Sequence, residues 1–580
     1  MNMISFKEII LKKNPNFLVR FHPTISNLIF NSISIILHEK KINDFLISHI
    51  DKQGIDFIDE IFDYLDFSFT LTQKDRERIP SQGKLIVIAN HPLGGLDGLV
   101  LIKLISDIRS DVKILVNDVL LELDNLNQFF LPFNLYNTKS QKENVHKILT
   151  SFKNEEAIIF FPAGEVSRFS LKGIIDKKWR KGVLFFANKY NVPILPIYIK
   201  GRNSIFFYLI SLINKNFSTL LLPHELFNKK GKNLELVVGN PIPTQNLFTT
   251  IKDENYQLKL LKKHLYKIGK RKIGIFKTEK NIIKPVDRQL LRKQINEAPL
   301  LGETDDGKKI FDLEFEKYPD VVREIARLRE ITFRKVGEGT GKKIDFDIYD
   351  KIYRHIVLWD DDNLEVVGAY RIGVCDDILL KYGEKGLYTS TLFNYSDDFR
   401  KRLPFSLELG RSFIQSKYWN SSALDYLWLG IGLFLSQNDC IKYLFGGVSL
   451  SGSYPIDAQE MILFFYNKWY GDNQKVVESK NPFLLSDKRS SELSLIFNGS
   501  DYKSDLRTLK GLLKMYGLTI PILFKQYTEL CNEGGARFFD FGIDPDFQSC
   551  IDGFIFIEID KIKQSKKDRY INRKILANVI

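Results

Sequence analysis

Cysteine is scarce in this sequence, with four among 580 residues: Cys375, Cys440, Cys531 and Cys550. They lie far apart and form no CxxC pair, so the sequence predicts neither a disulfide framework nor a zinc site. Unpaired cysteines are typical of proteins from a reducing compartment. We therefore expect a cytoplasmic protein that binds no metal.

Long apolar runs are also missing, because no stretch reaches the roughly 18 residues needed to span a bilayer. The strongest candidate is SIFFYLISLI, Ser204–Ile213, which ends at NKN. We interpret it first as a core helix, and alternatively as a segment lying in the membrane interface. The first residues, MNMISFKEIILKKNPNF, carry charges within their apolar part, so they do not predict a signal peptide.

Acidic side chains are outnumbered, since 84 Lys and Arg against 71 Asp and Glu give a net charge of +13. The excess is concentrated in residues 262–293, which hold twelve basic and two acidic side chains. Such a segment suits an anionic membrane surface, and the alternative is a solvated linker helix. We do not expect nucleic acid as a partner, because no zinc-finger spacing or RNA-recognition signature accompanies the charge.

A chain of 580 residues is too long for one core. Residues 1–75 show helical patterns, and from Lys84 short apolar runs alternate with helices. These runs are rich in β-branched residues and predict strands: LIVIAN, VKILVN, AIIFFPAGE, VPILPIYIKG and LELVVGNPIP. The alternation predicts an α/β domain with a mostly parallel sheet.

A second α/β pattern begins near Leu300. A helix, DVVREIARLREITFRKV, precedes strands at HIVLWD, EVVGAYRIGV, FSLELGRSFI, KYLFGGVSLS and GFIFIEID. No internal repeat relates the two patterns, so we predict two unlike α/β domains. The expected segments are a helical region 1–75, an α/β domain 76–260, a basic linker 261–300 and a second α/β domain 301–580.

The stretch NHPLGGLDG follows the first predicted strand, with His91 directly after LIVIA and Asp97 six positions later. In α/β folds, sites lie at the carboxyl edge of the sheet. Gly94 and Gly95 permit a tight turn that returns Asp97 to the imidazole. A carboxylate that orients a histidine prepares it as a general base. The alternative is a structural His–Asp pair.

A second polar turn, FFPAGEVSR, follows another predicted strand. Its residues Glu165, Ser167 and Arg168 are expected at the same sheet edge as His91. Arg168 is suited to bind a phosphate or a carboxylate. The alternative is an ordinary surface turn.

The blocks NHPLGGLDG, FPAGEVS, VPILPI and GNPIP, in this order, resemble the glycerol-phosphate and lysophospholipid acyltransferase superfamily. Two features depart from the family pattern: the spacing is H-x5-D rather than H-x4-D, and Ala163 replaces a glutamate. Both variants resemble the hemolysin-like branch, which acylates lyso-aminolipids. The resemblance implies that His91, oriented by Asp97, takes the proton of an acceptor hydroxyl, whose oxygen attacks an acyl thioester. The substrate-binding residues it implies are Gly94, Gly95, Glu165, Ser167 and Arg168.

In the second domain, FRKVGEGTG fits the R-x-x-G-x-G loop with which GNAT acyltransferases bind pyrophosphate. That loop should follow the central strand and open a helix. Here it precedes the sheet, so we interpret the match as a decoy. The better candidate is LELGRSFI, where Glu408 and Arg411 face one site if a bulge forms at Gly410. The alternative is a surface ion pair.

The blocks ITFRKVGEGTG, VVGAYRI, LELGRSFI, LWLGIGLFL and YLFGGVSLS resemble the GNAT-related N-acyltransferases of ornithine- and glycine-lipid synthesis, relatives of the acyl-homoserine-lactone synthases. The resemblance implies transfer of a 3-hydroxyacyl chain from acyl carrier protein to the amine of an amino acid. By this analogy Glu408 deprotonates or binds the amine, and Arg411 binds the donor or a carboxylate.

The whole chain thus resembles a bifunctional bacterial ornithine- or glycine-lipid synthase. This implies a lyso-aminolipid and an amino acid as substrates, acyl carrier protein or acyl-CoA as donor, no bound cofactor, and a place on the inner face of the cell membrane. Two other interpretations stay open. One is a conventional lysophospholipid acyltransferase with an accessory GNAT-like domain, and the other is a membrane-active protein without enzymatic activity.

Overall fold

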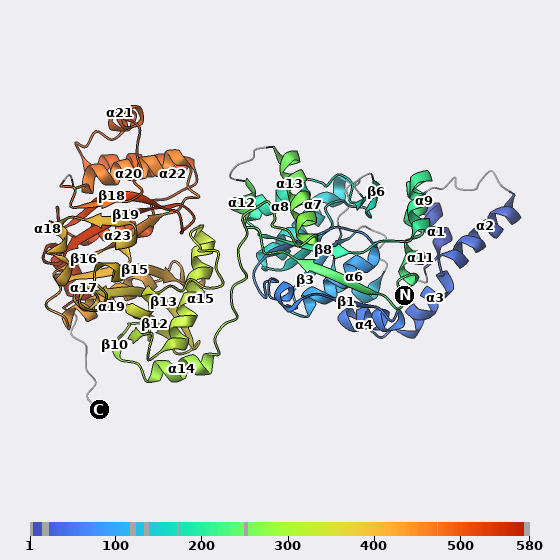
Figure 1. The fold of residues 1–580 in the computed structure, drawn as a ribbon, viewed down its shortest axis with the longest axis horizontal. Helices are drawn as coiled ribbons and strands as arrows, with labels where there is room; N and C mark the ends of the chain where they lie inside the picture. The colour runs from blue at the N-terminus through green and yellow to red at the C-terminus, as the bar shows by residue number, and fades with distance from the viewer. Residues whose placement is uncertain are drawn as a thin grey trace. The chain divides into compact units, whose positions relative to one another are not determined.

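The computed structural model describes residues 4–13, 22–116, 123–132, 138–170, 173–248, 253–472 and 474–572. The chain divides into two compact units, Met1–Asn281 and Ile282–Ile580 (Figure 1). We call them unit 1 and unit 2 and describe each by itself. The division falls inside the predicted basic linker 261–300.

Unit 1 begins with four helices, α1 (Phe6–Lys13), α2 (Pro23–Ile36), α3 (Glu39–Ser48) and α4 (Gly54–Tyr64). Within the same predicted helical region, β1 (Ser68–Thr70) forms a strand and joins the central sheet beside β9. Figure 1 shows α1, α2 and α3 in dark blue at one end of this unit, near α9 (Ile205–Ile213) and α11 (Leu222–Phe227).

The sheet of unit 1 has seven strands in the order β1-β9-β8-β2-β5-β3-β4. Its neighbouring strands are parallel except for β8 and β9. The strands besides β1 are β2 (Leu85–Ala89), β3 (Val112–Val116), β4 (Phe130–Pro132), β5 (Ala157–Phe160), β8 (Ile194–Lys200) and β9 (Asn233–Val238). A separate hairpin comprises β6 (Arg168–Ser170) and β7 (Gly173–Ile175). The remaining helices of unit 1 are α5 (Gln73–Arg76), α6 (Gly95–Ser106), α7 (Thr138–Lys153), α8 (Gly182–Tyr190), α10 (Lys215–Leu220), α12 (Thr244–Phe248) and α13 (Glu254–Gly269).

Strand β2 is buried on both faces of this sheet. Val87 and Ala89 pack into the core on one face, and Ile86 and Ile88 into the core on the other. A strand buried on both faces has no polar face, which explains the unbroken apolar run LIVIA. The stretch NHPLGGLDG therefore starts at the middle of the sheet's carboxyl edge.

The sheet of unit 2 has eight strands in the order β10-β11-β12-β13-β15-β16-β19-β18. Only β15 and β16 are parallel within this sheet. Its strands are β10 (Leu300–Glu303), β11 (Lys309–Glu314), β12 (Arg354–Asp360), β13 (Glu365–Val374), β15 (Ser406–Ile414), β16 (Tyr443–Leu450), β18 (Ala536–Asp544) and β19 (Cys550–Glu558). A separate two-stranded sheet joins β14 (Phe393–Tyr395) to β17 (Val477–Ser479).

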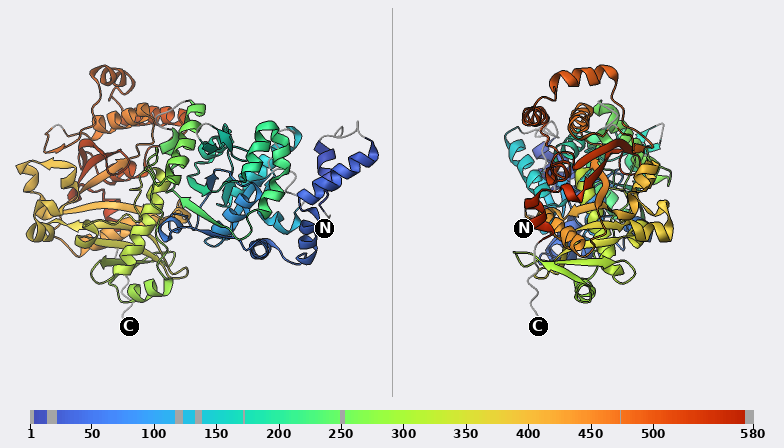
Figure 2. Two further views of the ribbon diagram at one scale, coloured as in Figure 1. Left: turned by 45° about the vertical axis from the view of Figure 1, so that its right-hand side comes forward. Right: turned by 90° about the vertical axis from the view of Figure 1, so that its left-hand side faces the viewer.

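Helices cover this sheet, among them α15 and α19, and α20 and α22 lie side by side along it in Figures 1 and 2. The helices of unit 2 are α14 (Arg288–Asn296), α15 (Pro319–Val336), α16 (Tyr349–Ile352), α17 (Cys375–Tyr382), α18 (Asp397–Arg400), α19 (Ala423–Ser436), α20 (Ile456–Tyr470), α21 (Asp487–Ile496), α22 (Tyr502–Met515), α23 (Ile522–Leu530) and α24 (Gln564–Tyr570). The prediction of two unlike α/β domains is confirmed.

The parallel pair in unit 2 is short, and β15 is irregular where it ends. Pairing of β15 with β16 runs only to Leu409 and Gly446. Beyond it Arg411 has a φ of +51°, and the register between β13 and β15 shifts between Ala369 and Arg371. The expected bulge beside Gly410 is therefore present, and it leaves β15 and β16 diverging.

The favoured interpretation of Ser204–Ile213 as a core helix is wrong. In α9, Phe207 and Tyr208 are buried, but Ile205 and Ile213 are 79% and 84% exposed. The apolar residues follow a helical period with only a narrow buried stripe, so most of the helix faces solvent. Among the helices of the described ranges, none is both long and apolar enough to cross a membrane.

Candidate functional site

The dyad region of unit 1 is fixed by the residue that ends β2. The side-chain amide of Asn90 donates to the Ile199 carbonyl at 2.9 Å and accepts from the Ile199 N–H at 2.8 Å. This pair ties the end of β2 to β8, and the chain then turns into α6. His91 therefore starts from a rigid point on the sheet.

His91 and Asp97 are brought together by that turn. His91 Nδ1 lies 3.0 Å from Asp97 Oδ2, and the same oxygen accepts from the N–H groups of Leu93 and Gly94 at 2.8 and 3.1 Å. Asp97 is fully buried, and burial raises the pKa of its carboxyl while the bonds from His91 and the amides lower it. Gly94 has a φ of +96°, which only glycine adopts without strain.

The other ring nitrogen of His91 is available for chemistry. A carboxylate at Nδ1 selects the tautomer with hydrogen on that atom, which leaves a lone pair on Nε2. No described residue makes a hydrogen bond to Nε2, and the side chain is 18% exposed. Phe161 stacks on the imidazole, with 4.1 Å between ring centroids, and limits its rotation. The arrangement can accept a proton from a group that approaches from solvent.

Asp176 connects the dyad to the second polar turn, and the sequence analysis did not identify it. Its Oδ1 accepts from the His91 N–H at 3.3 Å and from Ser167 Oγ at 2.5 Å, and its Oδ2 accepts from Trp179 Nε1 at 2.9 Å. The Ser167 N–H donates to the His91 carbonyl at 2.7 Å. A signal for Asp176 is its place just before the basic run KKWRK, but spacing alone does not distinguish it from a surface aspartate.

The structure separates the other residues expected at this edge. Ser167 is buried beside His91, whereas Glu165 pairs with Lys215 at 2.7 Å. Arg168 turns away and is 6% exposed, with its guanidinium donating only to hydroxyl groups and lying over the ring of Phe207. Those hydroxyl groups belong to Ser211, Ser218 and Thr219. Gly95 opens α6 with free space around it, so a side chain there would meet nothing within 4 Å.

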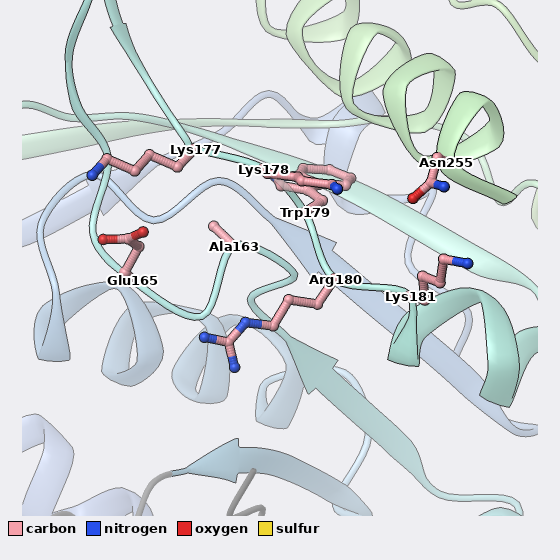
Figure 3. A pocket seen from close by; sticks show the side chains of 8 residues that line it. All are labelled: Ala163, Glu165, Lys177, Lys178, Trp179, Arg180, Lys181 and Asn255. Atoms are coloured by element: carbon pink, nitrogen blue, oxygen red, sulfur yellow. The ribbon is translucent and has the colours of Figure 1, made fainter. Parts of the chain in front are cut away.

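A basic pocket opens beside this turn. It has a volume of about 680 Å³ and contains four cationic side chains and one carboxylate, as Figure 3 shows. Arg180 packs against Gly164, and its backbone N–H donates to the Pro162 carbonyl at 2.9 Å. The pocket is thus built from the FPAGE turn and the segment that follows Asp176. Its lining residues are Ala163, Glu165, Lys177, Lys178, Trp179, Arg180, Lys181 and Asn255.

In unit 2, Glu408 is buried and both its oxygens are occupied. Oε1 accepts from the N–H and the hydroxyl of Thr389 at 2.7 and 2.6 Å. Oε2 accepts from the Tyr353 hydroxyl and from the Tyr388 N–H. Burial raises the pKa of this carboxyl, while the hydrogen bonds lower it. The arrangement anchors the chain around Tyr388 to β15.

Arg411 also contacts Tyr388, so both predicted residues reach this tyrosine, Glu408 at its backbone N–H and Arg411 at its ring. Its guanidinium sits 4.8 Å from the centroid of Tyr388 and 4.4 Å from that of Phe547. Its nitrogens lie 3.5 and 3.7 Å from the carboxylates of Asp345 and Asp347. These carboxylates raise the pKa of the buried guanidinium, so it stays charged.

A buried network of charges surrounds Arg411, and sequence reasoning missed it. Arg329 donates from Nε to Asp345 at 2.6 Å and from both terminal nitrogens to Asp350. Arg371 reaches Asp347 at 2.7 Å. The signal was the presence of Arg371 within the apolar stretch GAYRIG, because arginine is buried only when paired.

The loop FRKVGEGTG is poorly arranged to bind a phosphate. Gly337 ends α15 in the left-handed conformation, so the loop follows the carboxyl end of a helix. Glu330 already accepts from the N–H groups of Thr340 and Gly341 at 3.1 and 2.9 Å. An anion would therefore meet a carboxylate instead of free amides.

Two α/β units, one with a histidine–aspartate pair at a strand end and one with a diverging parallel strand pair, define the molecule as an enzyme of the acyltransferase class. The model of the family described as "Acyltransferase" matches residues 9–271, and that of "Acetyltransferase (GNAT) domain" matches residues 328–429. A glycine N(alpha)-acyltransferase of Bacteroides thetaiotaomicron is 34% identical over 305 residues, which cover 50% of this chain and 89% of that protein. A lyso-glycine lipid O-acyltransferase of Phocaeicola vulgatus is 32% identical over 234 residues, which cover 39% of this chain and 82% of that protein.

The chain therefore belongs to the acyltransferases and joins in one polypeptide a relative of each of these two enzymes. Among solved structures, the CoA-dependent acyl-homoserine lactone synthase MesI is 12% identical and is aligned over 47% of this chain and 100% of its own. The TM-score of that alignment is 0.23, which is too low to support a conclusion about the fold or function of this chain.

Proposed function

We propose that this acyltransferase makes a two-chain aminolipid from glycine. Unit 2 transfers a 3-hydroxyacyl chain to the amine of glycine, and unit 1 then acylates the hydroxyl group of that chain. The observation that carries the proposal is the fusion itself. One chain holds relatives of a glycine N-acyltransferase and of a lyso-glycine lipid O-acyltransferase, and the product of the first reaction is the acceptor of the second.

The geometry of unit 1 supports its half of the reaction. His91 Nε2 takes the proton of the acceptor hydroxyl, and the oxygen of that hydroxyl attacks the thioester carbon. The C–O bond forms, the C–S bond breaks, and the imidazolium returns the proton to the leaving thiolate. Asp97 holds the ring and stabilises the imidazolium through the 3.0 Å contact at Nδ1. Positioned acid–base catalysis of this kind contributes about 10²–10⁴ in rate.

The basic pocket supports an acyl donor that carries phosphate. Both acyl carrier protein and acyl-CoA present the thioester on a phosphorylated arm, and phosphate favours clustered Lys and Arg side chains. The pocket adjoins the turn that binds Asp176, and Asp176 in turn holds His91. We assign the pocket to the donor of unit 1. The exposed arginine Arg180 and lysines Lys177 and Lys178 are its expected phosphate contacts.

A membrane surface is the expected place of the second reaction, because its acceptor carries a fatty chain. The exposed apolar face of α9 supports this, together with apolar side chains of α2 such as Leu28, which is 70% exposed. Amphipathic helices of this kind lie in the interface without crossing it. We infer that unit 1 works at the inner face of the membrane.

Lipid mass spectrometry on cells that express the intact chain or the His91→Ala variant tests the proposal. The intact chain is expected to yield a two-chain glycine lipid, and the variant the one-chain lyso form. A lipid with ornithine in place of glycine would correct the head group only. If no aminolipid forms and the acyl composition of phospholipids changes, the conventional lysophospholipid acyltransferase is the right interpretation.

A further inference from the structure

A carboxylate without a partner lies near Arg411 in unit 2. Asp552, on β19, is 8% exposed, and its side chain makes no hydrogen bond to any residue in the described ranges. Burying a carboxylate without a partner is unfavourable, and such groups are retained where they serve a function. Asp552 belongs to none of the sites described above.

The register of the sheet places a second carboxylate against it. Asp552 is paired with Ser449 of β16, so both side chains project from the same face of the sheet, about 5 Å apart at Cβ. The hydroxyl of Ser449 donates to Glu338 Oε2 at 2.8 Å. Glu338, from the end of α15, is therefore brought to the same face as Asp552.

Glycine lies beside this pair on β16. Gly447 comes two residues before Ser449 on the same face of the sheet, and a Cβ there would lie 3.6 Å from Asp552 Oδ1. No side chain therefore extends from this position over Asp552, and pairing of β15 with β16 has ended one residue earlier, at Gly446. Within the described ranges no group of His, Cys, Asp or Glu side chains is arranged to hold a metal ion. An organic cation is the ligand that the charges favour.

Among the described residues, charged or titratable groups from several elements interact with Asp552. Asp544 comes from β18, Glu338 from the segment after α15 and Arg411 from β15, and Tyr388 and Cys550 are also within electrostatic range. Burial, with the repulsion of the other carboxylates, raises the pKa of Asp552 to about 8, and burial raises that of Glu338 to about 7. A bound ammonium group would relieve this repulsion and lower both pKa values, so that Asp552 is ionised when the acceptor is bound.

We propose that Asp552 and Glu338 receive the ammonium group of the amino-acid acceptor, that Arg411 binds its carboxylate, and that Asp552 accepts the proton which the ammonium must lose. This inference rests on the proposed N-acylation of glycine and deepens it. An α-amino acid carries its two charges close together, and Tyr388 connects the acids to the arginine. Arg411 lies over the ring of Tyr388, whose hydroxyl donates at 3.3 Å to Asp544, and the strand register places Asp544 on the same face of the sheet as Asp552.

The N–H bond of the ammonium breaks and its proton passes to Asp552, leaving a neutral amine with a lone pair. The amine attacks the thioester carbon, the C–N bond forms and the C–S bond breaks. The second proton of the nitrogen leaves with the thiolate as a thiol, and Asp552 returns its proton to solvent. Glu408 is not suited to this step, because both its oxygens are already hydrogen-bonded.

The test compares the intact chain with Asp552→Asn, using purified full-length protein, glycine and a 3-hydroxyacyl thioester, with N-acylglycine measured by mass spectrometry across pH. At pH 7 we expect kcat/KM for glycine to fall by about 10²–10⁴-fold. Because the free amine is more abundant at high pH, the loss is expected to shrink as pH rises. Asp546→Asn, an exposed aspartate of the same hairpin, is the matched control and should behave like the intact chain.

Three outcomes are distinguishable. If Asp552→Asn keeps kcat/KM within about twofold of the intact chain at pH 7, the inference is overturned. If its loss is equally large at every pH while thermal unfolding is unchanged, Asp552 is not the proton acceptor. If the intact chain acylates no amino acid with this donor, the proposed function fails, and the inference fails with it for a different reason.

Discussion

In unit 1 a partly exposed imidazole lies at the end of β2 beside one buried carboxylate, whereas the groups around Arg411 in unit 2 are carboxylates and guanidinium groups from loops, helix α15 and several strands. Unit 2 has one histidine, His355, and burial lowers its pKa to about 4, so it stays neutral. The difference follows the acceptors. A hydroxyl is neutral and loses its proton as it attacks, while an ammonium must first be bound as a cation and then neutralised.

The comparison implies that each unit can be disabled without the other. The largest separation is expected from Asp97→Asn. The Asp97 oxygen that faces His91 Nδ1 also accepts from the Leu93 and Gly94 amides, so an asparagine oxygen can keep these three contacts but no longer carries the charge that stabilises the imidazolium. Its NH₂ group takes the place of Oδ1, for which the described residues offer no hydrogen-bond partner. O-acylation is expected to fall by about 10²–10⁴-fold.

The measurement is the ratio of lyso to two-chain lipid, with N-acylglycine formation by the same preparation as the internal control. N-acylation should be unchanged. A parallel loss of both activities would contradict the separation of the two sites.

The two sites also differ in how far the sequence predicts them. His91 and Asp97 are six residues apart, and a strand end followed by two glycines suffices to predict their contact. Most strands of both sheets were predicted for the same reason, since local apolar runs determine them. The network of Arg329, Asp345 and Asp350 joins residues that only the tertiary fold brings together.

Two further differences between the sequence-based expectation and the structure, at α9 and at Glu408, also have physical causes. The apolar content of α9 suggested burial, but composition does not say which surface covers a helix, and none within unit 1 covers most of it. Glu408 and Arg411 both contact Tyr388, but the four hydrogen bonds of Glu408 depend on Tyr353, Tyr388 and Thr389, whose positions no local pattern predicts.

A smaller effect is expected from Glu408→Gln, which tests whether Glu408 anchors the chain around Tyr388 or accepts the proton of the ammonium group. Glutamine has one acceptor oxygen in place of two, so part of the buried bonding to Thr389 and Tyr388 is lost. We expect unit 2 to be destabilised by about 1–3 kcal/mol, measured as a lower unfolding temperature. N-acylation falls with it, but its pH profile keeps the shape of the intact chain. In the intact chain we expect N-acylation to rise toward pH 8. If this rise is lost in Glu408→Gln, Glu408 is the base instead.

The donor pocket of unit 1 predicts an effect on the KM for the acyl donor that is confined to O-acylation. Arg180→Ala removes one expected phosphate contact, and KM for the acyl donor in O-acylation should rise about tenfold with kcat little changed. Lys189→Ala, an exposed lysine of α8 outside the pocket, is the matched control. An unchanged KM for Arg180→Ala would show that the donor phosphates bind elsewhere.

The smallest effects concern the basic run between the two sheets and its attraction to a membrane. The run 262–293 carries twelve bases against two acids, and a basic side chain near an anionic bilayer contributes about 1 kcal/mol. Binding of the full chain to vesicles of anionic phospholipid should therefore weaken as salt rises, and Lys270→Gln should weaken it by about that amount per charge removed. Lys514→Gln on α22 removes an exposed lysine from unit 2 and serves as the control.

An equal loss of vesicle binding in both variants would mean that the net charge, and not this segment, attracts the protein to the bilayer. Binding that is indifferent to salt would leave the apolar face of α9 as the attachment.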